Sequence, residues 1–402
     1  MANTQPPTVD PIAPGMLPIP PAVRLALFYG AVFLVVGIYM PFWPVWLSSK
    51  GLGASEIGLL LAITTWTKVV ASPAVAQIAD RLGRRRPVMV GLALCTVASW
   101  SLYTLADGFW AMVPVAVLLG ASFPPMMPIG ENTTMLIAQA RGLDYGRIRL
   151  WGSLSFIAAA WGGGHWLAGR PDGMIAGLIL GGSLALVGAC LVLPDLRTPP
   201  APARRRSGPL RLLLRQPLFL LFLAAASLIQ SSHAVLYGFG TLHWRSAGLA
   251  DGTIGLLWAE GVIAEIALFA FSGRILSRFG VAPLMIAAAG AGVVRWTLTG
   301  LTTGLGVLAL LQLLHALTFG ATHLAAMHFI QRAAPEGASA TAQGLYSAIA
   351  AGAVLALVMT ASGQLYADFG GRAFYAMAVL AGLGGLAAAV LAGRWDGRRL
   401  DR

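Results

Sequence analysis

Residues 51–60 read GLGASEIGLL, and residues 248–257 read GLADGTIGLL. The identical positions of the first copy are Gly51, Leu52, Ile57, Gly58, Leu59 and Leu60. The copies lie 197 residues apart, from position 51 to position 248, in a chain of 402 residues, and each opens a long apolar segment. This offset indicates that one half-chain unit was duplicated, which is typical of membrane transporters built from structural repeats.

The composition predicts a polytopic membrane protein. Hydrophobic residues make up 57% of the chain and charged residues 10%, and the mean hydropathy is +0.76. A soluble domain has more charge and less apolar surface. The two cysteines, Cys95 and Cys190, both fall in apolar segments and indicate packing rather than a disulfide framework.

Apolar runs long enough to cross the roughly 30 Å hydrocarbon core of a membrane recur along the whole chain. We expect twelve spanning helices, near residues 24–47, 55–79, 87–106, 108–139, 150–168, 174–193, 217–245, 252–272, 281–300, 304–331, 341–366 and 372–394. Pro124, Pro125 and Pro128 each remove a backbone donor and predict a kink in the fourth span. The predicted fold is all-α, with twelve transmembrane helices in two pseudosymmetric six-helix halves.

The net charge of +12 reflects topology rather than nucleic-acid binding. With the amino terminus inside, the outer loops carry only Lys50, Arg170, Arg245 and Arg372, and nearly all other basic residues fall in inner loops. This asymmetry follows the positive-inside rule and places both termini in the cytoplasm. We therefore expect a multi-pass protein of a bacterial-type cytoplasmic (inner) membrane.

Composition also suggests the domain boundaries. Residues 1–23 are rich in proline and lack basic residues, so a disordered cytoplasmic tail is expected. The first half is expected over 24–193 and the second over 217–394. They are joined by a cytoplasmic linker over 194–216 that contains Arg204, Arg205 and Arg206, and 395–402 form a second tail.

The loop after the second span reads Asp80-Arg81-Leu82-Gly83-Arg84-Arg85-Arg86-Pro87. A tight turn needs a residue that tolerates positive φ, which Gly83 supplies. The plain alternative is a basic stop-transfer cluster. The stretch resembles the Asp-Arg-x-Gly-Arg-Arg loop of the major facilitator superfamily. This resemblance implies that Asp80, Arg81, Gly83 and Arg84 form a gating motif that latches the halves.

Further segments resemble the phenylpropionate permease branch, which is similar to lactose permease and the nucleoside:proton symporters. They are Tyr145 to Ser153, Leu236-Tyr237-Gly238, Ala321-Thr322-His323-Leu324 and Thr341 to Tyr346. The resemblance implies secondary active transport: proton-coupled uptake of a small organic anion such as 3-phenylpropionate by alternating access. The expected partners are that anion, protons and membrane lipid. We expect no nucleic acid, no catalytic residue, no metal and no cofactor beyond the proton gradient, and a monomer.

Ionisable residues inside spans are costly, at about 2.5 to 3.5 kcal/mol at the helix centre, and should face a wet cavity or a partner. Lys68 and Glu265 are 197 residues apart, from position 68 to position 265, so they occupy equivalent places in the two halves. We interpret Lys68 as an anchor for an anionic substrate and Glu265 as a proton carrier. A structural ion pair is the alternative for either residue. Glu260 lies about 140° from Glu265 around the helix and is the weaker candidate.

Arg295 and His315 form a second group, because histidine titrates near neutrality and an arginine tunes a nearby acid. His315, Phe319 and Thr322 share one face of an α-helix by their spacing. The resemblance to lactose permease implies a proton-coupling role for Arg295 and His315. The acid that follows the histidine there is replaced near Thr318 by a neutral residue, so Glu265 would have to take over proton carriage. Glu260, Glu131 and His315 remain the alternative carriers. A packing role remains the alternative for His315.

The remaining substrate-binding candidates are polar or aromatic. Glu131 and Arg149 form a pair, by resemblance, that binds substrate or ties two helices together. Tyr39 with Trp43, and His233 with Tyr237, are spaced i and i+4 and predict two walls around an aromatic ring. The alternative for these rings is an interfacial aromatic belt.

Two other functions are weighed against uptake. Proton-driven efflux of drugs or metabolites is the nearer one, but antiporters of this superfamily usually carry a Gly-Pro element in helix five, which 151–166 lacks. A membrane-embedded enzyme or lipid flippase is the other. His323 and His328 lack the spacing of a zinc site, and the chain has no phosphate-binding Gly-x-x-x-x-Gly-Lys loop, so we expect no enzyme.

Overall fold

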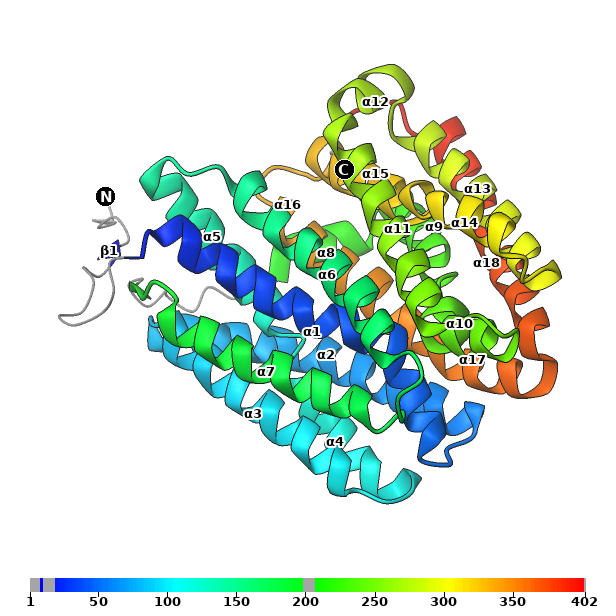
Figure 1. Ribbon diagram of the computed structural model, residues 1–402. Helices are drawn as coiled ribbons and strands as arrows, with labels where there is room; N and C mark the ends of the chain where they lie inside the picture. The colour runs from blue at the N-terminus through cyan, green and yellow to red at the C-terminus, as the bar shows by residue number, and fades with distance from the viewer. Residues whose placement is uncertain (1–7, 10–18, 198–206, 401–402) are drawn as a thin grey trace. The chain divides into compact units, whose positions relative to one another are not determined.

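A computed structural model describes residues 8–9, 19–197 and 207–400. The described chain is almost entirely helical, and its elements group into two compact units (Figure 1). The expected all-α membrane fold is confirmed. Much of the expected tail over 1–23, and Arg204, Arg205 and Arg206 of the expected linker, lie outside the described residues.

Unit 1 contains 1–52 and 66–203. Its helices are α1 (Pro21–Ser49), the part of α2 (Ala54–Leu82) from Trp66 onward, α3 (Arg85–Leu105), α4 (Phe109–Ser122), α5 (Met126–Arg141), α6 (Tyr145–Leu167) and α7 (Met174–Val192). A two-residue antiparallel ladder joins β1 (Thr8–Val9) to β2 (Leu196–Arg197). Small residues let helices approach closely, as at Gly37, where a Cβ would lie 2.7 Å from the Cβ of Ala159.

Unit 2 contains 53–65 and 204–402. It holds α8 (Ser207–Leu214), α9 (Pro217–Ser231), α10 (Ala234–Ser246), α11 (Asp251–Ala270), α12 (Ser272–Phe279), α13 (Val281–Leu301), α14 (Leu305–Leu313), α15 (Thr322–Ala333), α16 (Ser339–Ala348), α17 (Leu355–Phe369) and α18 (Ala373–Arg394). Three short irregular turns complete it: the π-helical η1 (Ala316–Ala321) and η2 (Ile349–Val354) and the 3₁₀ turn η3 (Gly370–Arg372).

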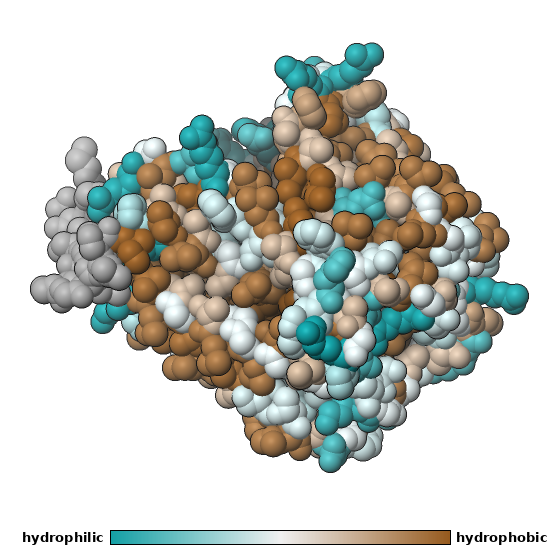
Figure 2. All heavy atoms as spheres, in the orientation of Figure 1, coloured by the Kyte–Doolittle hydropathy of each residue, from teal (hydrophilic) through white to brown (hydrophobic). Residues whose placement is uncertain are grey.

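The expected spans match the helices. Among the described residues, ten helical segments are long and apolar enough to cross a membrane, and one of them, Ser339–Arg394, covers two expected spans. The helix α6 carries Arg147 and Arg149 and completes the set of twelve. Apolar side chains also cover broad areas of the visible surface, as expected where the solvent is lipid (Figure 2).

The repeat has matching backbone conformations in its two copies. Gly51 and Gly248 both adopt positive φ, of 83° and 86°, and α2 and α11 begin at equivalent positions, Ala54 and Asp251. A side chain at either glycine would be strained, because only glycine visits this region at low cost. The sequence repeat therefore corresponds to a repeated helix start.

The first part of α2 packs within unit 2. A Cβ on Gly58 would lie 2.6 Å from Cα of Gly363 in α17, and Ser55 Oγ donates to Gln364 Oε1 at 3.0 Å. The two helices therefore touch through their backbones at this point, which only a pair of glycines allows.

The predicted kink in the fourth span is confirmed. α4 ends at Ser122 and α5 begins at Met126, with Pro124 and Pro125 in the break. A second break divides the seventh expected span between α9 and α10, at Ser232 and His233. The sequence carries no proline at this second break, so it was not expected.

Candidate functional site

Unit 2 gathers buried and partly buried polar side chains from five segments. They are Glu265 from α11, Arg295 from α13, Gln312 from α14, His315 and Thr318 from the start and middle of the η1 region, and His233 from the break between α9 and α10. Arg295, His233 and Thr318 are completely buried. Because each charge inside a span is costly, such a group should be fully hydrogen-bonded or functional.

Arg295 is the centre of this group. Its Nη1 lies 3.2 Å from Nδ1 of His315 and donates to Thr318 Oγ1 at 2.9 Å, and its Nη2 donates to Gln312 Oε1 at 2.8 Å. The guanidinium also lies over the ring of Trp296, 4.6 Å from its centroid. The planar fork of arginine is therefore held in one orientation by three helices.

The bond from Arg295 determines the tautomer of His315. A guanidinium nitrogen only donates, so Nδ1 of His315 accepts and a neutral imidazole carries its hydrogen on Nε2. That Nε2 lies 3.8 Å from Oε2 of Glu265. The imidazole is thus oriented between a fixed cation and a carboxylate.

His233 is oriented by the same reasoning. Its Nδ1 lies 3.0 Å from the carbonyl oxygen of Gln230, which only accepts, so Nδ1 carries the hydrogen. Its Nε2 then accepts from the hydroxyl of Thr318 at 3.0 Å. Thr318 accepts from Arg295 and donates to His233, and it joins the two residues.

Local backbone features make these approaches possible. η1 replaces α-helical turns with π-helical ones directly after His315, a feature that occurs often at functional sites. Two glycines lie against the site: a Cβ on Gly261 would lie 3.3 Å from Cβ of His315, and one on Gly320 would lie 3.3 Å from Cγ of Glu265. A larger residue at either position would push the helices apart.

Aromatic rings surround the polar group. The rings of His315 and Phe319 are stacked with centroids 5.3 Å apart, and those of His233 and Tyr237 are stacked at 5.6 Å. His233 also meets Trp296 edge to face at 5.0 Å. Tyr237, His315 and Phe319 are half-buried rather than fully buried.

The structure brings together most of the unit 2 residues singled out from the sequence. Glu265, Arg295 and His315 are neighbours, and His233 joins them through Thr318. Thr322 differs: it is completely buried, and its hydroxyl donates to the carbonyl of Thr318. The expected single face assumed an α-helix, and the π-helical η1 breaks that spacing. The binding roles of Thr322, Tyr237 and Phe319 stay predictions.

Unit 1 contains the second predicted pair. Arg149 Nε lies 3.9 Å from Oε1 of Glu131, so the pair bridges α6 and α5. This contact is expected both of a substrate-binding pair and of a structural tie between the helices. The Arg149 guanidinium also lies over the rings of Phe33 and Tyr29, at 4.3 and 5.3 Å from their centroids. Lys68 lies half-buried on the part of α2 that belongs to unit 1. Substrate contact by these residues stays a prediction.

The aromatic pair on α1 lies in a packed cluster. Trp43 is 2% exposed and stacks on Trp46 at 4.5 Å, with Trp100 and Tyr103 edge-on at 4.7 and 4.9 Å. Tyr39 meets Trp100 at 5.4 Å. A ring-binding role for Tyr39 and Trp43 stays a prediction, and it would require this cluster to open.

The loop motif is held inside unit 1. Gly83 has φ of 62°, as the sequence predicted. Arg84 Nη2 and Nε both donate to Oδ2 of Asp195, at 2.8 and 3.1 Å, and Arg85 Nη2 lies 3.7 Å from Oδ1 of Asp80. These contacts tie the loop after α2 to the chain that follows α7. The gating role of Asp80, Arg81, Gly83 and Arg84 stays a prediction.

Sequence reasoning missed three partners. Gln312 and Trp296 contact Arg295, and Asp195 pairs with Arg84. Gln312 carried a usable signal, since a polar side chain three residues before His315 lies on the same helix face in an apolar span. No signal in the sequence pointed to Asp195, because its partner Arg84 is 111 residues away along the chain.

Comparisons with known proteins bear on the chain as a whole. The model of the MFS_1 like family matches residues 22–377. The chain is 34% identical over 367 residues to a probable 3-phenylpropionic acid transporter of Escherichia coli, covering 89% of this chain and 94% of that protein. It is 29% identical to a maltose permease of Geobacillus stearothermophilus, covering 81% and 83% of the two chains.

A solved structure shares the fold. The nucleoside transporter NupG superposes with a TM-score of 0.79 over 94% of this chain and all of that one, at 18% sequence identity. At this identity the likeness concerns the fold alone.

Proposed function

The chain belongs to the MFS_1 like family, and from this premise we propose that it takes up a small organic anion together with protons. It is a multi-pass membrane transporter of the major facilitator superfamily rather than an enzyme. We assign it to the bacterial inner membrane as a monomer with both termini in the cytoplasm.

The arrangement of Glu265, His315 and Arg295 in unit 2 carries the proposal. With Glu265 ionised and His315 neutral, the positive charge of Arg295 is balanced. When Glu265 takes a proton, a net positive charge remains inside the membrane, where it is costly. A carboxylate substrate restores the balance. Anion binding and protonation of Glu265 therefore favour each other, which is the requirement for proton symport.

The rings at the site favour an aromatic acid. Phe319, His315 and Tyr237 are half-buried aromatic residues beside the charges. Aromatic pairs contribute about 0.5 to 1.5 kcal/mol beyond their buried area. The E. coli relative is named for 3-phenylpropionic acid, which combines a ring with a carboxylate. We propose that class of substrate here, because a neutral sugar would not supply the negative charge that balances Arg295.

The transport cycle follows from the charge balance. The proton and the anion enter together from outside, and the occupied site has no excess charge during the conformational change. Loss of the proton to the cytoplasm restores the Glu265 carboxylate, which then repels the anion. In unit 1, we propose Lys68 and the Glu131–Arg149 pair as further substrate-binding residues.

The test is uptake of radiolabelled 3-phenylpropionate into proteoliposomes with an imposed inward proton gradient. Wild type is compared with Glu265→Gln and with Glu260→Gln, a matched control on the same helix. We expect accumulation in wild type and in the control. Glu265→Gln should lose accumulation but keep exchange of labelled for unlabelled solute, because exchange requires no net release of a proton.

Other outcomes would overturn parts of the proposal. If Glu265→Gln still accumulates the solute, Glu265 does not carry the transported proton. Uptake of maltose or a nucleoside without uptake of the aromatic acid would contradict the substrate class and leave the transporter fold intact.

A further inference from the structure

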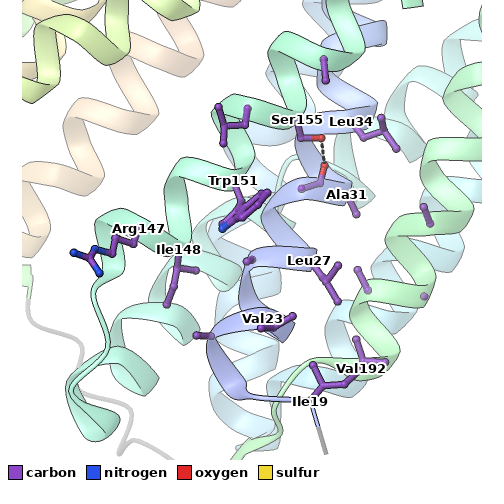
Figure 3. Close-up of a pocket in the computed structure, with 18 residues that line it drawn as sticks. Ile19, Val23, Leu27, Ala31, Leu34, Arg147, Ile148, Trp151, Ser155 and Val192 are labelled. Carbon is purple, nitrogen blue, oxygen red and sulfur yellow. Dashed lines mark hydrogen bonds between the residues drawn. The ribbon is translucent and has the colours of Figure 1, made fainter. Parts of the chain in front are cut away.

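A groove in unit 1 is lined by none of the candidate site residues described above. It is formed by α1, α6 and α7 and has a volume of about 930 Å³. Ile19 and Val192 lie near one end and Leu34 and Ser155 near the other (Figure 3). This volume is in the range of sites that hold whole small molecules.

The lining of the groove is apolar. Small residues such as Gly30, Ala158 and Gly188 leave the space open, and Val23 and Leu27 line it with exposed side chains. Ser155 is also present, but its hydroxyl donates to the carbonyl of Gly30 at 2.7 Å. Water gains few hydrogen bonds along such a surface, so hydrocarbon is the favoured content.

The length of the groove matches one leaflet of a membrane. Its lining on α6 extends from Arg147 to Ala158, about 16 Å at the helical rise of 1.5 Å per residue. Half of the hydrocarbon core is roughly 15 Å thick. The space therefore fits a lipid chain that enters from one side and ends near the membrane centre.

A cation lies at one end. Arg147 is the only charged lining residue among those that the structure describes, and its side chain is 88% exposed. In Figure 3 its side chain extends from the first turn of α6, away from α1. Its Nε lies 3.5 Å from Oδ2 of Asp144. An exposed arginine can reorient at little cost and bind a phosphate with two hydrogen bonds.

The groove is separate from the candidate substrate residues of unit 1. Arg147 and Arg149 are two residues apart, so they point about 200° apart around α6. Arg149 faces Glu131 and Phe33. Filling the groove should therefore leave that pair in place.

We propose that this groove binds a phospholipid, with an acyl chain between α1, α6 and α7 and the phosphate on Arg147. The apolar lining, the length of one leaflet and the single cation at the end match the parts of such a molecule. Trp151, exposed on α6 one turn after Arg147, reports on the occupant because it lines the groove.

The test uses quenching of tryptophan fluorescence by bromine. Protein is placed in vesicles of a phosphate-free galactolipid with increasing fractions of phosphatidylglycerol that carries brominated acyl chains. The chain has 12 tryptophans, so the signal of Trp151 is taken as the difference between wild type and Trp151→Phe. Trp161, exposed on the same helix outside the groove, is measured in the same way as a control for random lipid contact.

We expect Trp151 quenching to saturate while the brominated lipid is still a minor component, and Trp161 quenching to rise linearly. Gly188→Leu fills the groove and should remove the saturating component, whereas Gly181→Leu, two turns earlier on α7 and equally open, should not. Arg147→Gln should raise the half-saturating fraction about fivefold, since a basic residue at the surface contributes about 1 kcal/mol.

Three results would overturn the proposal. The first is a linear response of Trp151 like that of Trp161, and the second is saturation that survives Gly188→Leu or is unchanged by Arg147→Gln. The third is displacement of the brominated lipid by 3-phenylpropionate, which would make the groove a solute site. The Trp161 signal shows in each variant that the helix is still embedded.

Discussion

Nη1 of Arg295 lies 3.2 Å from Nδ1 of His315, although the two residues belong to different helical segments 20 positions apart. The contact fixes the hydrogen of neutral His315 on Nε2, the atom that faces Glu265. A proton added to Nδ1 would place two positively charged donors next to each other, and they would repel. The arrangement therefore favours Glu265 over His315 as the group that gains and loses the transported proton.

Arg295→Lys keeps the positive charge but replaces the planar guanidinium group with a single ammonium. One ammonium cannot reach Nδ1 of His315, Oγ1 of Thr318 and Oε1 of Gln312 with the geometry seen here. Loss of one charged hydrogen bond should lower the free energy of unfolding by about 1.5 to 3 kcal/mol. Thermal unfolding in detergent measures this, with the exposed Arg278→Lys as control. Equal stability of the two variants would contradict the central position of Arg295.

Thr318→Val tests the link between Arg295 and His233. Valine has the same shape but neither donates nor accepts, so two buried partners lose a hydrogen bond. We expect the free energy of unfolding to fall by about 1 to 3 kcal/mol, and gradient-driven uptake to fall with it. For the measurement of stability, Thr322→Val is the matched control, since that hydroxyl only bonds the carbonyl of Thr318 one turn earlier. The network would be unimportant if both variants behaved alike.

The pairing of Arg84 with Asp195 is testable by charge exchange. Asp195→Arg should slow transport because it places two cations together at the loop after α2. The double variant Arg84→Asp with Asp195→Arg should recover most of the rate, because the pair is re-formed with reversed sign. Initial uptake rates at equal expression measure this. A double variant as slow as the single one would argue that Asp195 acts through another contact.

The close contact of Gly58 with Gly363 predicts a steric effect. A Cβ on Gly363 would lie 2.9 Å from the carbonyl oxygen of Ala54 and 3.1 Å from Cα of Ser55, so Gly363→Val should separate α2 from α17. In a background with Cys95 and Cys190 replaced by serine, Ser55→Cys should then react faster with a maleimide. Gly344→Val, at an open helical position, should leave the rate unchanged. Equal rates in both variants would contradict the contact.

The sequence predicted the helices well because their signals are local. Each signal can be recognised from neighbouring residues in the chain. These signals are the apolar runs of membrane length, the repeat at Gly51 and Gly248, and the prolines of the fourth span. Gly83 was expected at positive φ for the same reason. The fold class followed from these signals alone.

The site was predicted only in part, because its geometry depends on contacts between distant segments. The intramembrane charges Glu265, Arg295 and His315 were recognisable as unusual. The bridge through Thr318, the partner Gln312 and the pairing of Asp195 with Arg84 were not. The π-helical η1 also changed the face of Thr322, and no glycine or proline pattern in 316–321 predicts such a turn.

The most direct test of the central claim is proton uptake caused by substrate binding. 3-Phenylpropionate is added to solubilised protein in weakly buffered solution with a pH indicator, and binding is followed by tryptophan fluorescence. We expect alkalinisation close to one proton per bound anion in wild type and in Glu260→Gln, and none in Glu265→Gln. Binding without proton uptake in wild type, or unchanged uptake in Glu265→Gln, would contradict it.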